Sequence, residues 1–403
     1  MKKIIIIGAG TAGTIIANKL QKINRNNRFE ITVIDKQSIH YYQPGYLFLP
    51  FGKLEEHQVK KDKKDLFIDG VNLEISKVSK IDAENNRLIM EDGNSKPYDL
   101  LVIATGVNIR PDETEGMTGD LWYKNIFDFY TMEGAKKLRE ALKSFNGGDL
   151  VMHIVEMPIK CPVAPLEFVF LVDEYLRDRG IRDKTNIKYV TPLEGAFTRP
   201  LAAKKLGGLL EERNIKIVPN FGTEKIDNEQ QMLLGYDGRE VGFDLLVTVP
   251  TNMGSNLIES SGLGNELNLV PTNQYSLQSK KHKNIFVAGD ASDIPASKAG
   301  SVAHFQAETI ITNILRYFKG KKMKESFKGH ANCFIETGDN KGVMIDFDYD
   351  NEPNVRKIPF EGIGPFSGLS ESRINHWGKV TMRQYYWNIL LKDRFSKILN
   401  LIK

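Results

Sequence analysis

Cysteine is scarce in this chain, and several other features that would assign it to a class are missing. Two cysteines among 403 residues exclude a framework of disulfides. No apolar stretch approaches the roughly 20 residues that a membrane-spanning helix needs. The run Ile4–Ile7 leads straight into glycines, unlike a secretory signal. The net charge is only +4, with no long basic run interleaved with aromatic residues, so we do not expect nucleic acid as a partner. We therefore expect a protein of the cytoplasm or of the cytoplasmic face of a membrane.

The first motif that is present is a glycine loop between a strand and a helix. An apolar, β-branched run at residues 3–7 predicts a buried strand, and the loop Gly8–Gly13 (GAGTAG) follows it directly. In this pattern Gly8 permits a tight turn, Gly10 lets the backbone approach a pyrophosphate, and Gly13 lets the helix pack closely. Asp35 stands 22 residues beyond Gly13, at the end of a second predicted strand, where a carboxylate can accept ribose hydroxyls. The loop predicts a dinucleotide at the helix N-terminus.

Two further segments specify the dinucleotide. Residues 284–290 (NIFVAGD) form a predicted strand that delivers Asp290 to its C-terminal edge, and residues 101–106 (LVIATG) end on Thr105 and Gly106. Both segments resemble signatures of flavoproteins with two dinucleotide-binding domains, in which the aspartate binds the ribityl chain of FAD. The resemblance implies FAD across the first domain.

The order of elements predicts an α/β protein with two tandem Rossmann-like domains. Two strand–helix–strand units, each followed by hairpin strands and a buried strand, repeat after about 140 residues. We assign residues 1–110 and 245–320 to an FAD-binding domain, 111–244 to a second domain, and 321–403 to a C-terminal region. Residues 73–92 are expected to form a hairpin, and Lys60–Lys64 a solvated charged patch.

The second domain lacks the glycine loop that a nicotinamide site would need. Its first predicted strand, residues 150–156, is followed by MPIKCPVAP, which contains no glycine. Prolines and a cysteine do not offer the close backbone approach that a pyrophosphate requires. Cys161 stands there instead, just ahead of a predicted helix from residue 164, a position that favours a lowered thiol pKa, with Lys160 adding to the effect. A buried, inert Cys161 is the alternative reading.

At this point the chain resembles the sulfide:quinone oxidoreductases and the related flavoproteins of flavocytochrome c sulfide dehydrogenase. Besides the nucleotide motifs, the match rests on Cys161 with Glu167 six residues on, on residues 298–300 (KAG), and on Cys333. The resemblance implies that Cys161 and Cys333 form a redox pair that hydrosulfide attacks, that Glu167 is a general acid or base, and that Lys298 stabilises the reduced flavin. It also implies Tyr42, Pro44, Gly300 and Phe334 as candidates for a quinone pocket.

The chain departs from that pattern in two respects. Many members carry a third cysteine, which is missing here and puts a three-thiol mechanism in doubt. The flavocytochrome branch often binds FAD covalently through a cysteine after the second strand, where this chain has residues 40–44 (HYYQP). We therefore expect non-covalent FAD and no metal.

The C-terminal stretch, residues 373–403, mixes basic residues with aromatic and aliphatic ones at helical spacing. Such a pattern suits an interfacial helix on anionic lipid, which would make the protein peripheral on the cytoplasmic membrane face. The alternative is a helix docked on its own domain or in a homo-oligomer interface, and the oligomeric state stays open. The residues that carry the pattern are Trp377, Lys379, Arg383, Tyr385, Tyr386, Trp387, Ile389, Leu390, Leu391, Lys392, Arg394, Phe395, Lys397, Ile398, Leu399, Ile402 and Lys403.

The leading hypothesis is an FAD-dependent sulfide:quinone oxidoreductase that oxidises hydrosulfide to sulfur or polysulfide and passes two electrons to membrane quinone. A type II NADH dehydrogenase is disfavoured by the missing second glycine loop. A cytochrome-linked sulfide dehydrogenase is disfavoured by the absent covalent cysteine. A flavin-bound sulfur carrier without quinone turnover remains a third alternative.

Overall fold

The computed structural model describes residues 1–353, 355, 357–358 and 365–392. Its first layer is a five-stranded parallel sheet in the order β20-β9-β1-β2-β5. The apolar run at the start of the chain becomes its central strand because Ile4–Ile7 is buried on both faces. The strands are β1 (Lys2–Ile7), β2 (Phe29–Asp35), β5 (Val71–Ile75), β9 (Leu100–Ile103) and β20 (Ile285–Val287).

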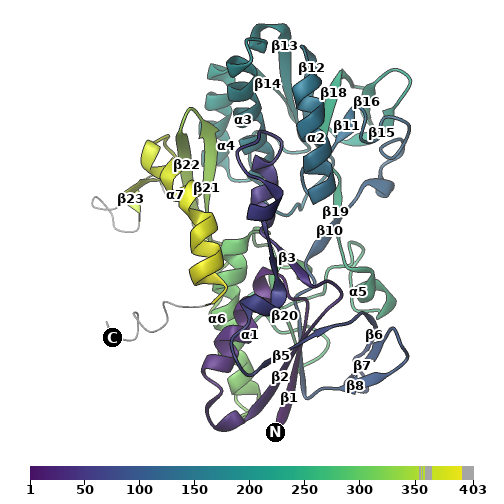
Figure 1. The fold of residues 1–403 in the computed structure, drawn as a ribbon, viewed down its shortest axis with the longest axis vertical. Helices are drawn as coiled ribbons and strands as arrows, with labels where there is room; N and C mark the ends of the chain where they lie inside the picture. The colour runs from purple at the N-terminus through teal and green to yellow at the C-terminus, as the bar shows by residue number, and fades with distance from the viewer. Residues whose placement is uncertain (354, 356, 359–364, 393–403) are drawn as a thin grey trace.

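Each face of this sheet is covered differently, as the alternation along β1 requires. Ile4 and Ile6 pack with the helices α1 (Thr11–Lys22) and α6 (Gly300–Tyr317), which lie side by side (Figure 1). Ile5 and Ile7 pack with an antiparallel sheet and with α5 (Asn256–Ser260). That antiparallel sheet consists of β6 (Val78–Asp82), β7 (Arg87–Met90) and β8 (Ser95–Pro97). The hairpin expected at residues 73–92 therefore begins later, because residues 71–75 join the parallel sheet instead.

A second five-stranded parallel sheet repeats the arrangement in the order β11-β18-β12-β13-β14, again followed by a three-stranded antiparallel sheet. The predicted internal repeat is thus present in the topology. The parallel strands are β11 (Ile126–Phe127), β12 (Gly148–Ile154), β13 (Thr185–Val190), β14 (Ile215–Val218) and β18 (Leu245–Val249). The antiparallel strands are β15 (Thr223–Asp227), β16 (Met232–Gly235) and β17 (Glu240–Gly242). The helices are α2 (Met132–Ser144), α3 (Ala164–Asp178) and α4 (Pro200–Glu212).

Short connections join these two halves to the C-terminal part. The chain crosses between the halves twice, through the antiparallel pair β10 (Val107–Arg110) and β19 (Thr251–Gly254). A small ladder, β3 (Ile39–Tyr41) with β4 (Lys60–Asp62), follows the first βαβ unit. The C-terminal part forms a hairpin of β21 (Ala331–Gly338) and β22 (Lys341–Phe347), the pair β23 (Lys357–Ile358) and β24 (Phe366–Ser367), and the helix α7 (Arg373–Tyr385).

The hairpin β21–β22 lies between α3 and α7 and contacts both (Figure 1). This packing places the loop that precedes α3 beside β21, and α7 packs against the same strand. The position matters because each of these three elements carries a residue of the candidate site. None of the helices in the described part of the chain is both long enough and apolar enough to cross a membrane.

Candidate functional site

The glycine loop has the geometry that a pyrophosphate needs. A side chain at Gly13 would overlap the carbonyl oxygen of Gly8, and one at Gly8, whose φ is +100°, would strike the carbonyl of Ala104. These two glycines are therefore required by close packing. Gly10, in contrast, faces open space with no heavy atom within 4 Å of an added Cβ, and α1 starts beyond it without a side-chain cap. The free helix N-terminus and the space beside Gly10 fit an anionic phosphate group.

Asp35 closes the loop from the end of β2. Its Oδ2 atom accepts a hydrogen bond of 2.7 Å from the backbone N–H of Ala9, and its Oδ1 atom lies 2.8 Å from Nζ of Lys63. Lys63 is buried and also donates to the carbonyl of Gln37. The expectation that residues 60–64 form a solvated patch is therefore wrong for Lys63, because its carboxylate partner lies beside the nucleotide loop. Sequence reasoning missed this lysine.

The two other flavin motifs meet the first sheet at its C-terminal edge. Thr105 has a buried hydroxyl without a hydrogen-bond partner among the described residues, and Gly106 follows with a φ of +65° and open space beside it. Asp290 lies in the short turn that follows β20, and burial raises the pKa of its carboxyl while the charges of Lys298 and Lys160 oppose that shift. Nζ of Lys298 donates to the backbone carbonyls of Asp290 at 2.7 Å and of Ser292 at 3.0 Å. A hydroxyl without a hydrogen-bond partner and a half-buried carboxyl at this edge fit a polar cofactor chain.

Cys161 is held in an uncommon backbone conformation ahead of α3. Its φ is +87°, a region that residues with a side chain rarely adopt. Its N–H donates to the carbonyl of Lys298 at 2.8 Å, and its own carbonyl accepts from the N–H of Ala164 at 2.8 Å and from the hydroxyl of Tyr130 at 3.3 Å. These contacts fix the thiol between the second half of the chain and the start of α6. Strained residues of this kind concentrate at functional sites.

Cys333 comes to the same place from β21. Both cysteines are free, β21 packs on α3, and a charge on Cys333 adds to the effect of burial in raising the pKa of Cys161 across this contact. Burial also raises the pKa of Cys333 to about 11, although the charge of Lys379 opposes the shift. The sequence-based expectation of a lowered pKa at Cys161 is therefore wrong in this structure. Desolvation, together with the charges of Cys333 and Glu167, outweighs the lowering effects of Lys379 and of the backbone N–H of Ala164.

Glu167, in the first turn of α3, is fully buried beside these thiols. Its Oε1 atom accepts a 2.8 Å hydrogen bond from the N–H of Glu336, and burial raises the pKa of its carboxyl. The structure thus brings together Cys161, Cys333 and Glu167, the three residues that the resemblance implied.

A lysine that the sequence assigned to a lipid-facing helix completes this cluster. Nζ of Lys379, on α7, lies 2.6 Å from Oε1 of Glu167 and donates to the carbonyl of Phe334 at 3.1 Å. Burial would lower the pKa of Lys379, but the charges of Glu167 and Cys161 outweigh it, so the pKa is raised and the ammonium stays protonated. A buried cation beside two thiols and a carboxylate can stabilise a thiolate as it forms. Basic residues on an amphipathic helix look alike in sequence, so no local signal distinguished this one.

A second carboxylate and a histidine lie next to the cluster. Oε1 of Glu336, on β21, lies 2.7 Å from Nδ1 of His376 on α7. Burial raises the pKa of Glu336 to about 7, while the hydrogen bond and charge of His376 oppose the shift. Neither residue was predicted, because they stand 40 residues apart in the chain and give no local signal that β21 and α7 pack together.

The four quinone candidates differ in their surroundings. Tyr42 is buried, and the charges of Lys379 and Glu167 act on its hydroxyl, whose pKa burial raises to about 12. Phe334 packs on Phe366, with ring centroids 5.0 Å apart. Pro44 is exposed, two residues after Tyr42, and Gly300 is the exposed first residue of α6. Tyr42 and Phe334 therefore lie near Lys379. That all four residues line one quinone pocket stays a prediction.

The C-terminal segment is docked on the first half of the chain as far as the structure describes it. The hydroxyl of Tyr386 lies 2.6 Å from Nε2 of His40 and 2.8 Å from Oγ1 of Thr11, and Nδ2 of Asn18 donates to the carbonyl of Leu391 at 2.8 Å. Four residues assigned to a lipid-facing surface are therefore buried in the protein. They are Tyr386, Trp387, Leu390 and Leu391. The remaining ones from Arg394 onward lie outside the described residues.

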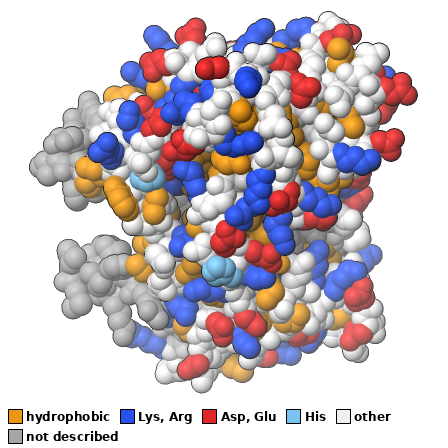
Figure 2. Space-filling model, turned by 45° about the horizontal axis from the view of Figure 1, so that its top comes forward, with side chains coloured by type: hydrophobic (Ala, Val, Ile, Leu, Met, Phe, Trp, Pro, Cys, Tyr) orange, Lys and Arg blue, Asp and Glu red, His pale blue; other side chains and the backbone are white. Residues whose placement is uncertain are grey.

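The outer face of α7 is different. Ile374, Trp377, Val380 and Tyr385 are exposed, with Trp377 at 63%. Figure 2 shows hydrophobic side chains gathered at its left edge, the side on which α7 lies in Figure 1. One helix thus carries Lys379 inward and an apolar stripe outward.

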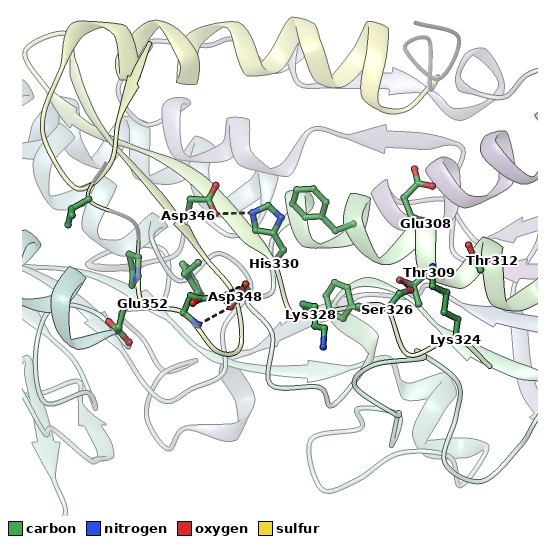
Figure 3. A pocket seen from close by; sticks show the side chains of 16 residues that line it. Glu308, Thr309, Thr312, Lys324, Ser326, Lys328, His330, Asp346, Asp348 and Glu352 are labelled. Atoms are coloured by element: carbon green, nitrogen blue, oxygen red, sulfur yellow. Dashed lines mark hydrogen bonds and ion pairs between the residues drawn. The ribbon is translucent and has the colours of Figure 1, made fainter. Parts of the chain in front are cut away.

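A cavity of about 880 Å³ lies on another side of the hairpin, between α6 and the hairpin β21–β22 (Figure 3). Its lining carries both signs of charge, and it contains neither of the cysteines and not Glu167. His330 stacks on Phe305 there, with ring centroids 4.2 Å apart, and its Nε2 atom lies 2.9 Å from Oδ1 of Asp346. This cavity is separate from the cluster around the thiols.

The structure combines a glycine loop that fits a phosphate, in the first of two Rossmann-like halves, with Cys161 just ahead of α3 and Cys333 on the neighbouring strand β21. Residues 2–155 match the family model described as pyridine nucleotide-disulphide oxidoreductase. The particular likeness is to sulfide:quinone oxidoreductases, as the motifs implied. The mitochondrial sulfide:quinone oxidoreductase of Dictyostelium discoideum is 26% identical over 403 residues, which cover 98% of this chain and 86% of that protein.

A solved structure and a second kind of relative complete the comparison. The structure of the sulfide:quinone oxidoreductase from Aquifex aeolicus superposes with a TM-score of 0.83 at 21% identity, covering 100% of this chain and 95% of that one, which confirms the fold. The type II NADH:quinone oxidoreductase of Staphylococcus aureus is 25% identical and covers 86% of this chain and 90% of that protein.

Proposed function

We propose that this protein is an FAD-dependent sulfide:quinone oxidoreductase. The observation that carries the proposal is the joining of Cys161, Cys333 and Glu167 at the position where a second nucleotide loop would otherwise stand. Similarity to sulfide:quinone oxidoreductases over 98% of the chain supports it. The type II NADH:quinone oxidoreductases are also similar, but the loop after β12 holds no glycine that would admit a nicotinamide dinucleotide.

The residues around the glycine loop would hold the cofactor without a covalent bond. Gly10 and the N-terminus of α1 take the pyrophosphate, Asp35 the ribose, and Asp290 with Thr105 the ribityl end. Bound FAD would accept two electrons from the sulfur and deliver them to a quinone. The only two cysteines of the chain lie at the thiol cluster, so neither is free to attach FAD.

The protein's own residues would then act on hydrosulfide as follows. Hydrosulfide attacks one sulfur of a disulfide or polysulfide bridge between Cys161 and Cys333. The S–S bond breaks, a new S–S bond forms to the attacking sulfur, and the other cysteine leaves as a thiolate. Lys379 stabilises this thiolate, because its charge lowers the pKa of Cys333. Glu167 accepts or returns the proton on the sulfur, since burial raises the pKa of its carboxyl.

The acceptor side would meet the membrane at α7. Its exposed stripe of Ile374, Trp377, Val380 and Tyr385 suits the interface of a bilayer, and quinone would reach Tyr42 and Phe334 from there. We propose a peripheral protein on the cytoplasmic face of the membrane.

The test uses purified holoprotein under anaerobic conditions. Sulfide should bleach the flavin absorbance, a soluble quinone should restore it, and NADH should do neither. Cys333→Ser and Cys161→Ser should keep FAD but lose bleaching by sulfide, while dithionite still reduces both variants. Bleaching by NADH and not by sulfide, or full activity in either variant, would overturn the proposal.

A further inference from the structure

We propose that Glu336 and His376 form a proton relay that connects the buried Glu167 beside the two thiols with solvent. The inference deepens the proposed function and rests on it. It concerns two residues that lie outside the thiol chemistry itself. Their place in the fold, between a buried acid and the surface, is what points to this role.

The three side chains form a graded path from the interior outward. Of the side-chain surface, 1% is exposed at Glu167, 4% at Glu336 and 16% at His376. The backbone N–H of Glu336 donates to Glu167 at 2.8 Å, which holds β21 against α3, and the charge of Glu167 acts on the Glu336 carboxyl. On its other side, Oε1 of Glu336 lies 2.7 Å from Nδ1 of His376. The path therefore runs from α3 through β21 to α7.

Two buried oxygens along this path are free to take a proton. Among the described residues, Oε2 of Glu167 and Oε2 of Glu336 are both buried without a hydrogen-bond partner. A buried carboxylate oxygen without a donor is unfavourable, so each is either protonated or bound to water. Both states serve the transfer of a proton along the path.

Among the charged groups around it, Glu336 is the one that we expect to gain and lose the proton during the transfer. Those that act on its carboxyl are Glu167 from α3 and His376 and Lys379 from α7. Lys379 stays protonated between Glu167 and the carbonyl of Phe334, so it fixes charge and does not relay a proton. Burial raises the pKa of Glu336 to about 7, so its carboxyl can take up and release a proton near neutral pH.

The chemistry requires such a path when neutral hydrogen sulfide enters the buried site. Its oxidation to bound sulfur releases two electrons and two protons, and bound FAD would take up the electrons and one of the protons. The second proton has to leave, and it would pass from Glu167 to Glu336 and His376. Reduction of the quinone to quinol takes up one proton, and the relay would supply it from solvent. The protons released and taken up in one turnover are then equal in number.

The experiment measures the rate of flavin bleaching by sulfide in stopped flow across pH 5.5–9. We expect Glu336→Gln, which keeps the shape and a hydrogen bond to His376, to lower the limiting rate at least tenfold with unchanged FAD content and half-saturating sulfide. Its pH profile should lose the step near pH 7. His376→Ala should be slowed similarly and be restored several-fold by added imidazole, a response that a merely structural role would not give.

The matched control is His330→Gln, which breaks a comparable histidine–carboxylate pair on the same hairpin at the separate cavity (Figure 3). It should bleach at the wild-type rate. The relay is overturned if Glu336→Gln and His376→Ala match the wild type, or if they are slow with an unchanged pH profile and no response to imidazole. A wild-type protein that sulfide does not bleach would instead refute the proposed function.

Discussion

The ammonium of Lys379 lies 2.6 Å from the carboxylate of Glu167, joining the C-terminal helix α7 to the helix α3 in the second half of the chain. This ion pair is buried, since the two side chains are 11% and 1% exposed. It fixes the charge state of the site and the position of α7 together. A buried pair of this kind is sensitive to the loss of one partner.

Lys379→Met should therefore destabilise the fold and the site at once. Removing the cation leaves the Glu167 carboxylate uncompensated, which costs about 3–5 kcal/mol in the free energy of unfolding and favours its protonated form. We expect at least a tenfold loss in the rate of bleaching by sulfide. Denaturant unfolding and stopped flow measure the two effects, with the exposed Lys341→Met as the control. An unchanged free energy of unfolding would contradict the role of the ion pair.

Gly10 and Gly13 should respond to alanine in opposite ways. At Gly13 the new Cβ overlaps a backbone carbonyl, so Gly13→Ala should destabilise the protein by about 1–3 kcal/mol or more even without cofactor. At Gly10 the Cβ enters free space, so Gly10→Ala should fold as stably as the wild type. It should lose most of its FAD, because that space is where we place the pyrophosphate. Thermal unfolding of the apoprotein and flavin content per protein test this pair, and full flavin content in Gly10→Ala would refute the placement.

Trp377 should contribute to membrane binding and little to folding. Because 63% of it is exposed on the outer face of α7, Trp377→Gln should leave the melting temperature unchanged. Affinity for vesicles containing anionic lipid should fall about tenfold through lost apolar burial. The control is Tyr236→Gln, since Tyr236 is 78% exposed far from α7 in the second half of the chain. Equal vesicle binding by wild type and Trp377→Gln would exclude α7 as the contact.

Glu336 should make stability depend on pH around neutrality. Its pKa is raised from 4.5 to about 7, so the folded state holds a proton that the unfolded state has already released in this window. Ionised Glu336 therefore lowers the free energy of unfolding. This loss is absent below pH 4.5, grows as the pH rises from 4.5 to about 7, and is complete above about pH 7. Glu336→Gln should therefore gain about 3 kcal/mol relative to the wild type between pH 4 and pH 8. Unfolding at several pH values measures it, with the exposed Glu84→Gln expected to show no such gain.

The nucleotide-binding half could be predicted from the sequence because its signals are local. Gly8–Gly13 follows its strand directly, and Asp35 ends the next strand, so contact follows from the βαβ geometry alone. The same holds for the missing second loop, which the composition of residues 157–165 shows without any structure. Cys161 was located in this way, and its proximity to Cys333 could be inferred only through the resemblance.

The sequence by itself determined the two Rossmann-like halves, the nucleotide loop and the identity of the thiol residues, because each depends on residues near one another in the chain. Only the tertiary structure decided that Lys63 and Lys379 are buried and that Tyr386 faces His40. A lysine in an amphipathic pattern has the same sequence signature whether lipid, water or a buried carboxylate faces it. Which of these it meets depends on long-range packing, here of α7 against β21 and of residues 386–391 against α1.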